Sequence, residues 1–179
     1  MKIINKKKGQ VWIETVLYTL IALALIGLVL GFVMPKINQT KDKLLIEQTI
    51  NLLTLMDDKI NRAAETVDTS RRIEFTIKKG ELYINSSSNE IVFVLDKLGE
   101  PYSSPGKDGK KGPVIIMTES DQKDYRVRLS LDYSSRYNLT YSGTDEDKKF
   151  NPSPTPYFLM VKNKGMFGAI QLDIYPING

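Results

Sequence analysis

Residues 15–34 read TVLYTLIALALIGLVLGFVM, an apolar run without a charged side chain. At a rise of about 1.5 Å per residue, a helix of this length spans about 30 Å, the thickness of the hydrocarbon core of a bilayer. A cleaved secretory signal usually has a shorter apolar core and an A-x-A-like site after it. Pro35 and Lys36 follow the run here instead. The sequence therefore predicts a retained membrane-spanning helix.

The residues before this span are short and basic. Residues 1–9 read MKIINKKKG and contain four lysines and no acidic residue. Basic residues stay on the inner side of a membrane, so we expect a single-pass protein with its N-terminus inside and its C-terminal domain outside. Removing these four lysines from the 25 Lys and Arg of the chain leaves 21, which equals the number of Asp and Glu. The net charge of +4 therefore belongs to the leader, and we predict no nucleic-acid partner.

The composition also limits which disulfides, metal sites and catalytic groups the protein can have. The 179 residues include neither cysteine nor histidine. Disulfides, zinc sites built on His or Cys, and His-based catalytic triads are therefore excluded. We find no Gly-rich phosphate loop and no convincing catalytic pair. The sequence predicts a protein that is not an enzyme and has no cofactor and no metal site.

An amphipathic pattern follows Pro35. Its apolar positions, three or four residues apart, are Ile46, Ile50, Leu53, Met56, Ile60, Ala63 and Val67. This spacing is typical of one face of a helix, which we place at residues 36–70. The stripe is too short to indicate a coiled coil, so we expect it to pack on the sheet that follows.

From residue 71 to residue 179 the apolar pattern has a period of two. Residues 73–77 and 125–133 alternate apolar and polar side chains, and residues 114–117 form a short continuous apolar run. These patterns predict about seven strands, ending with strands at 157–161 and 166–174. The predicted fold is α+β: a long N-terminal helix, membrane span first and amphipathic segment second, packed on a C-terminal antiparallel β-rich domain.

Two segments of this domain are predicted to be exposed loops. They are residues 99–112, GEPYSSPGKDGKKG, and residues 142–156, SGTDEDKKFNPSPTP. The acidic residues at 145–147 do not have the spacing of an EF-hand, which favours a solvated loop over a cation site. Tyr125, Tyr133, Tyr137 and Tyr141 suit packing within a sheet better than a carbohydrate-binding face.

The N-terminal stretch KKKGQVWIETVLYTLIAL combines a basic leader, Gly9, Glu14 and an apolar helix. A carboxylate near a helix N-terminus is favoured by the helix dipole, but the combination is more specific. It resembles archaeal type IV pilin-like proteins with a class III signal peptide, over about residues 1–35. The sequence departs from the familiar pattern at Trp12, where a small residue is frequent. The resemblance implies that a prepilin peptidase cuts between Gly9 and Gln10, which makes Glu14 the fifth mature residue.

The resemblance also implies a mechanism of assembly. The helix at residues 10–35 would leave the lipid and pack with other pilin-like subunits in the core of a surface filament. Glu14 would neutralise the new ammonium on Gln10 of a neighbouring subunit, or that of its own chain, four residues away. Gly27 and Gly31 form a G-x-x-x-G pair, which either permits close helix packing or reflects the frequency of glycine in membrane helices.

Two further expectations concern the external part. Asn38, Asn85 and Asn138 each begin an N-x-[ST] triplet, so an external chain is expected to be a glycoprotein. The leading interpretation is a structural subunit, major or minor, of an archaeal type IV pilus-like filament, with a role such as adhesion. The alternative is a membrane-anchored extracellular binding module that does not polymerise.

Overall fold

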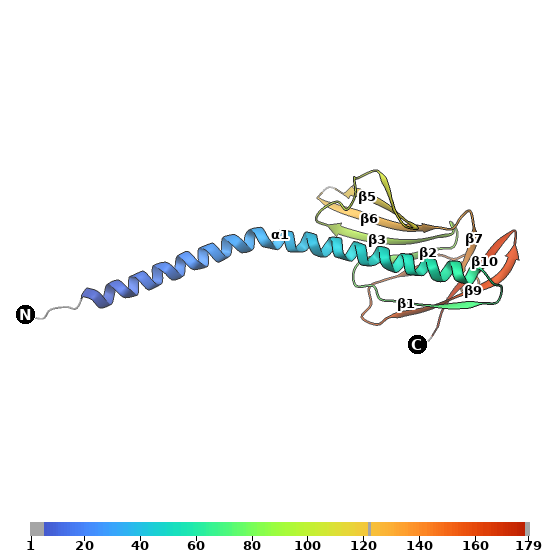
Figure 1. Cartoon of the computed structure of the whole chain (residues 1–179), viewed down its shortest axis with the longest axis horizontal. Helices are drawn as coiled ribbons and strands as arrows, with labels where there is room; N and C mark the ends of the chain where they lie inside the picture. Colours follow the sequence, from blue (N-terminus) through green and yellow to red (C-terminus); the bar gives the residue numbers. More distant parts are fainter. Residues whose placement is uncertain (1–5, 122, 178–179) are drawn as a thin grey trace, which may run out of the picture. The chain divides into compact units, whose positions relative to one another are not determined.

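In the computed structural model, residues 6–121 and 123–177 are described, with side chains from Val11 onward. The chain divides into two compact units, Met1–Lys41 and Asp42–Gly179. A single helix, α1 (Lys6–Ala64), supplies the described part of the first unit and the first element of the second (Figure 1). Pro35 lies inside α1, and the helix continues past it.

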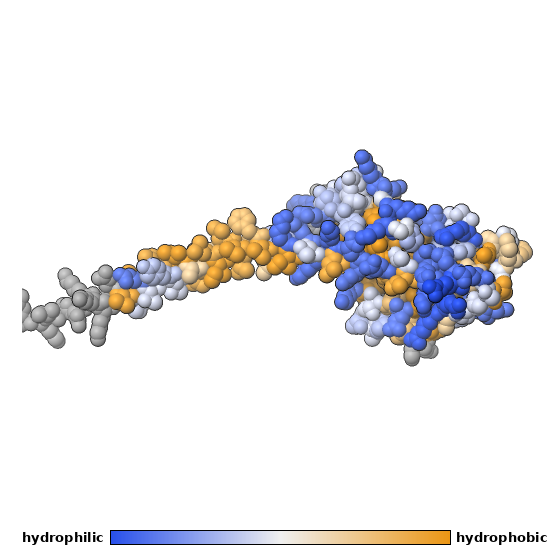
Figure 2. Space-filling view, viewed as in Figure 1, coloured by the Kyte–Doolittle hydropathy of each residue, from blue (hydrophilic) through white to orange (hydrophobic). Residues whose placement is uncertain are grey.

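Between Val11 and Met34 the helix of the first unit is exposed on all sides and, apart from Glu14, uncharged. Trp12 is 71% exposed and Phe32 is 74% exposed, and Figure 2 shows the apolar surface of this segment in orange. The hydroxyl groups of Thr15 and Thr19 donate to the carbonyl oxygens of Val11 and Thr15, at 2.9 and 2.8 Å. Within the described residues, α1 is the one helix long and apolar enough to cross a membrane. This agrees with the predicted span.

In the second unit, residues 42–64 of α1 pack on two sheets. Six members of the predicted stripe are buried: Ile46, Ile50, Leu53, Met56, Ile60 and Ala63. The prediction was wrong at its end, because α1 stops at Ala64 and not at residue 70. Val67 therefore lies outside the helix and is 57% exposed.

The described part of the second unit contains ten strands. They are β1 (Ser70–Phe75), β2 (Glu81–Asn85), β3 (Glu90–Leu98), β4 (Asp108–Lys111), β5 (Val114–Asp121), β6 (Asp124–Asp132), β7 (Tyr137–Tyr141), β8 (Lys148–Phe150), β9 (Tyr157–Phe167) and β10 (Ala169–Pro176). One sheet has the order β1-β9-β10-β7, and the other has the order β4-β5-β6-β3-β2-β8. One hydrophobic core joins α1 and both sheets, which confirms the α+β fold.

The strand pattern departs from the prediction in three ways. The short strands β4 and β8 lie inside the two segments predicted as loops; neither has a strand-like sequence, and each is held by pairing with a neighbour. β9 continues to Phe167 and β10 begins at Ala169. The single strand predicted at residues 166–174 therefore covers the end of β9 and most of β10. β7 and β10 are parallel, whereas the other pairs between named strands are antiparallel.

A turn at Lys79 and Gly80 leads into β2. Gly80 has a φ of +88°, which favours glycine. An added Cβ at Gly80 would lie 2.5 Å from the carbonyl oxygen of Val94. The close passage of β3 therefore requires glycine at this turn.

Candidate functional site: the apolar half of α1

The predicted processing site lies at the start of α1. Gly9 and Gln10 are within the helix, while the side chain of Gln10 and all of residues 1–5 lie outside the described part of the chain. Glu14 is exposed and lies four residues after Gln10, on the same face of the helix. Cleavage between Gly9 and Gln10 would therefore place the new amine about one helical turn before Glu14.

Gly27 and Gly31 share one exposed face of α1. A Cβ added at either position would meet no atom within 4 Å in the described part of the chain. The surrounding side chains, such as Leu23 and Leu28, are about 60% exposed. This face can therefore accept a second helix at short range, as a G-x-x-x-G pair allows.

The three predicted glycosylation sites have different surroundings. Asn38 is exposed on α1, whereas Asn85, at the end of β2, is half-buried. Asn138 is half-buried in β7, and its Nδ2 donates to Oε1 of Gln171 at 2.6 Å. Glycosylation stays a prediction, and Asn138 is the site at which it would disturb an existing contact.

Two carboxylates of α1 hold the segment predicted as the first exposed loop. Asp42 accepts from Nζ of Lys79 and from the backbone N–H of Gly99, both at 3.2 Å. Glu47 accepts from the hydroxyl of Tyr102 at 2.5 Å and from Nζ of Lys111. The polar residues beside the apolar stripe therefore attach residues 99–112 to the helix.

The same contacts change the acidity of both partners. The hydrogen bond from Lys111, followed by that from Tyr102, lowers the pKa of the Glu47 carboxyl. Burial, together with the adjacent Glu47 carboxylate, raises the pKa of Tyr102 to about 12. At neutral pH the pair is therefore a carboxylate that accepts from a protonated phenol.

Two of the four tyrosines considered for carbohydrate binding pack on α1. Tyr133 is fully buried and its hydroxyl donates to Oδ1 of Asp57 at 2.9 Å, while Tyr137 donates to Oδ1 of Asn61 at 3.0 Å. The guanidinium of Arg136 lies 5.3 and 5.2 Å from the centres of the two rings. Burial, followed by the charge of Asp57, raises the pKa of Tyr133. These tyrosines join helix to sheet and are not a free binding face.

The role of Asn163 was not predicted from the sequence. This residue of β9 is buried, and its Nδ2 donates to the carbonyl oxygens of Ala63 and Ala64, at 3.2 and 3.0 Å. Its Oδ1 accepts from the N–H of Gly165 at 2.8 Å. The last carbonyls of a helix have no partner within the helix, so Asn163 caps the end of α1 from a distant strand, together with the hydroxyl of Thr69, which donates to Ala63 at 3.1 Å.

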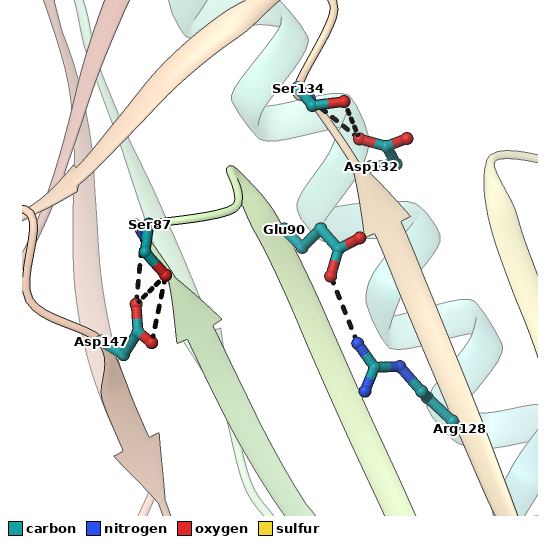
Figure 3. Close-up of polar contacts among 6 residues, drawn as sticks. All are labelled: Ser87, Glu90, Arg128, Asp132, Ser134 and Asp147. Atoms are coloured by element: carbon teal, nitrogen blue, oxygen red, sulfur yellow. Dashed lines mark hydrogen bonds and ion pairs between the residues drawn. The ribbon is translucent and has the colours of Figure 1, made fainter.

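The predicted acidic loop braces the β-rich domain. Asp147 accepts from the N–H and the hydroxyl of Ser87, at 3.3 and 3.2 Å (Figure 3). Neighbouring strand contacts in the same view join Arg128 to Glu90 and Ser134 to Asp132. No cluster that would hold a metal ion, with three or more acidic, His or Cys side chains, occurs among residues 6–121 and 123–177.

The geometry defines an α+β domain attached to an exposed apolar helix of membrane-spanning length. Comparisons with protein-family models, with curated proteins and with solved structures found no match to this chain.

Proposed function

We propose that this chain is a structural subunit, major or minor, of an archaeal type IV pilus-like surface filament. A prepilin peptidase removes residues 1–9. The apolar half of α1, residues 10–35, then holds the protein in the membrane, with the β-rich domain outside the cell. During assembly the same half leaves the lipid and packs with other pilin-like subunits.

One observation carries this proposal. The large apolar side chains between Val11 and Ile37 are all at least 40% exposed in the single chain, while the stripe from Ile46 onward is buried. Exposing a large apolar side chain costs about 1.5–3 kcal/mol relative to burying it. The first half of α1 therefore needs an apolar surrounding from outside the chain. A helix that is apolar all round fits lipid and a bundle of its own copies equally well.

The alternative is a membrane-anchored extracellular binding module that does not polymerise. A permanent anchor would have the same exposed helix, so this observation does not separate the two functions. What favours assembly is the combination of Gly9, Gln10 and Glu14 at the start of that helix. Two experiments on these residues test the choice.

The first experiment concerns processing. We expect mass spectrometry of the membrane and filament fractions to find N-terminal peptides that begin at Gln10. Gly9→Val should block the cut, because the peptidase must approach the backbone where glycine has no side chain. Peptides that begin only within residues 1–8 would support a permanent anchor instead.

The second experiment concerns Glu14. Cleavage creates an ammonium on Gln10 with an ordinary pKa near 8, and a filament core makes such a charge costly unless it is paired. If Glu14 of a neighbouring subunit pairs with it, Glu14→Ala should leave processed monomer in the membrane and abolish filaments. Electron microscopy and an immunoblot for processed protein measure both. Filaments at normal yield from Glu14→Ala would show that Glu14 acts within its own chain or at the membrane interface.

A further inference from the structure

The N-terminal end of the apolar helix carries one large aromatic side chain. Trp12 is 71% exposed, and it is the only tryptophan of the chain. It follows the last lysine of the basic leader, Lys8, and precedes Glu14. Tryptophan is enriched where a membrane meets water, because its ring is apolar while its N–H is a hydrogen-bond donor. Trp12 therefore has the chemistry and the position of an interfacial anchor.

The length of the apolar segment makes such an anchor important. α1 is one continuous helix over Lys6–Ala64, so its rise can be counted along the whole segment. From Val11 to Met34 the helix rises about 35 Å, whereas the hydrocarbon core of a bilayer is about 30 Å thick. A segment longer than the hydrocarbon does not fix its own depth, which depends on the anchors at its two ends.

One depth suits the side chains at both ends of the segment. When the uncharged run 15–34 fills the hydrocarbon, Lys36 lies about 3 Å beyond it at one end. At the end that follows the leader, Glu14 lies about 1.5 Å and Trp12 about 4.5 Å beyond it. The headgroup layer on each side is about 5–7 Å thick, so this depth places all three side chains in the headgroup layers.

The same depth decides where the proposed cut lies. The bond between Gly9 and Gln10 is then about 8 Å outside the hydrocarbon, where the headgroups meet water. Hydrolysis adds one water molecule across this bond and leaves a carboxylate on Gly9 and an ammonium on Gln10. Hydrocarbon excludes water and makes both new charges costly. A shift of the helix by about 5 Å into the membrane would bring the bond most of the way to the hydrocarbon.

Glu14 opposes such a shift, but it does not fix the depth alone. A carboxylate is well hydrated both among the headgroups and in water, so Glu14 limits only how deep the helix goes. The ring of Trp12 favours the headgroup layer over water, and its N–H favours that layer over hydrocarbon. Trp12 therefore opposes movement of the helix in both directions.

We propose that Trp12 anchors the start of α1 in the headgroup layer and thereby positions the Gly9–Gln10 bond for hydrolysis. Trp12 is a positioning residue: it acts through the depth of the helix and does not contact the reacting atoms. This inference rests on the processing proposed above, and it adds the residue that sets the depth of the cut.

The single tryptophan allows this depth to be measured in the native full-length chain. The protein is reconstituted in phosphatidylcholine vesicles that carry a nitroxide either near the headgroup or near the middle of the acyl chains. The shallow nitroxide should quench the fluorescence of Trp12 more strongly than the deep one. Trp12→Leu with Leu20→Trp is the matched control, because Leu20 is 59% exposed and lies within the span, where the deep nitroxide should quench more strongly. Stronger quenching of Trp12 by the deep nitroxide would overturn the anchor.

A pair of variants tests whether Trp12 sets the depth. Both chains carry Leu20→Trp as the reporter, one with Trp12→Tyr and the other with Trp12→Leu. Tyrosine keeps a ring with a polar end and should hold the native depth, whereas leucine favours hydrocarbon and should let the helix slide deeper. The ratio of deep to shallow quenching at position 20 should therefore be higher with Trp12→Leu. Equal ratios would show that Trp12 does not set the depth.

The rate of processing gives the functional readout. With a prepilin peptidase in the same vesicles, Trp12→Leu should slow the appearance of an N-terminal Gln10 by about fivefold, and Trp12→Tyr should keep the native rate. Cleavage of Trp12→Leu at the native rate would overturn the positioning. So would slow cleavage without a change of depth, since the peptidase would then recognise the side chain itself.

The failure of this inference is distinguishable from that of the proposed processing. A native chain that is not cut after Gly9 contradicts the processing, and the positioning role is then lost with it. The depth of Trp12 is measured without cleavage, so a native chain that is cut normally while Trp12 lies deep in the hydrocarbon contradicts the inference alone.

Discussion

The two halves of α1 have the same secondary structure and opposite surroundings. From Val11 to Ile37 every large apolar side chain is at least 40% exposed, whereas from Asp42 to Ala64 one face of the helix is buried in the core of a folded domain. The second half is stabilised by tertiary packing, which supplies most helical stability in proteins. The first half requires an apolar phase or other helices. One helix therefore combines a segment that is long and apolar enough to cross a membrane with a segment that belongs to the core of a domain.

The largest expected effect comes from a substitution that disrupts the packing of residues 42–64 of α1. A truncated chain that begins at Lys36 should be soluble and unfold cooperatively, because the stripe from Ile46 to Ala63 has its partners within residues 42–177. Ile60 is fully buried, so Ile60→Asp places a charge in the core. We expect a loss of about 3 kcal/mol or more in the free energy of unfolding, measured by urea denaturation.

Leu55→Asp is the matched control for this change. Leu55 lies on the same helix but is 64% exposed, so the substitution should alter the free energy of unfolding by only about 0.5 kcal/mol. An equal loss from both variants would mean that the two faces of this segment are not distinguished by burial. An unchanged Ile60→Asp variant would show that the helix does not pack on the sheets.

The next effect concerns where the packed half of the helix ends. Asn163→Ala removes the donor to the carbonyl oxygens of Ala63 and Ala64 and should cost about 1–3 kcal/mol in the truncated chain. Asn163→Asp keeps the shape but directs a carboxylate at the negative end of the helix, so it should cost more than alanine. Thermal unfolding of both variants measures the order. Better tolerance of Asp than of Ala would show that Asn163 acts through its volume and not as a cap.

Periodicity explains what was predictable in this chain. The stripe from Ile46 to Ala63 was found residue by residue, because burial on one helix face repeats every three or four positions. The span was found because its length and lack of charge suffice. Both features depend on local sequence alone.

Long-range pairing explains what was missed. The end of α1 is capped in part by Asn163, about a hundred residues away, and β4 and β8 are held as strands by pairing with their neighbours. The parallel pairing of β7 with β10 depends on topology in the same way. None of these leaves a periodic signal in the sequence.

The smallest expected effect concerns Glu47, a polar contact between α1 and residues 99–112. Hydrogen bonds from Lys111 and Tyr102 lower the pKa of Glu47 below its ordinary value of 4.5. A lowered pKa means that the folded state favours the carboxylate, so this stabilisation is complete above pH 4.5 and is lost as the pH falls through the folded pKa. Because Glu47 is partly exposed, Glu47→Gln should cost only about 1 kcal/mol at pH 7.

The pH dependence of that difference distinguishes a bound carboxylate from a general loss of charge. The gap in melting temperature between the native truncated chain and Glu47→Gln should be constant from pH 7 to about pH 5, and should shrink as the pH is lowered towards 3. Glu100→Gln, an exposed position in the segment that Glu47 holds, is the control and should give almost no gap at any of these values. A gap for Glu47→Gln that is the same at pH 7 and pH 3 would show that the carboxylate does not anchor residues 99–112 to α1. The polar attachment of this part of the helix would then rest on Asp42, Asp57 and Asn61.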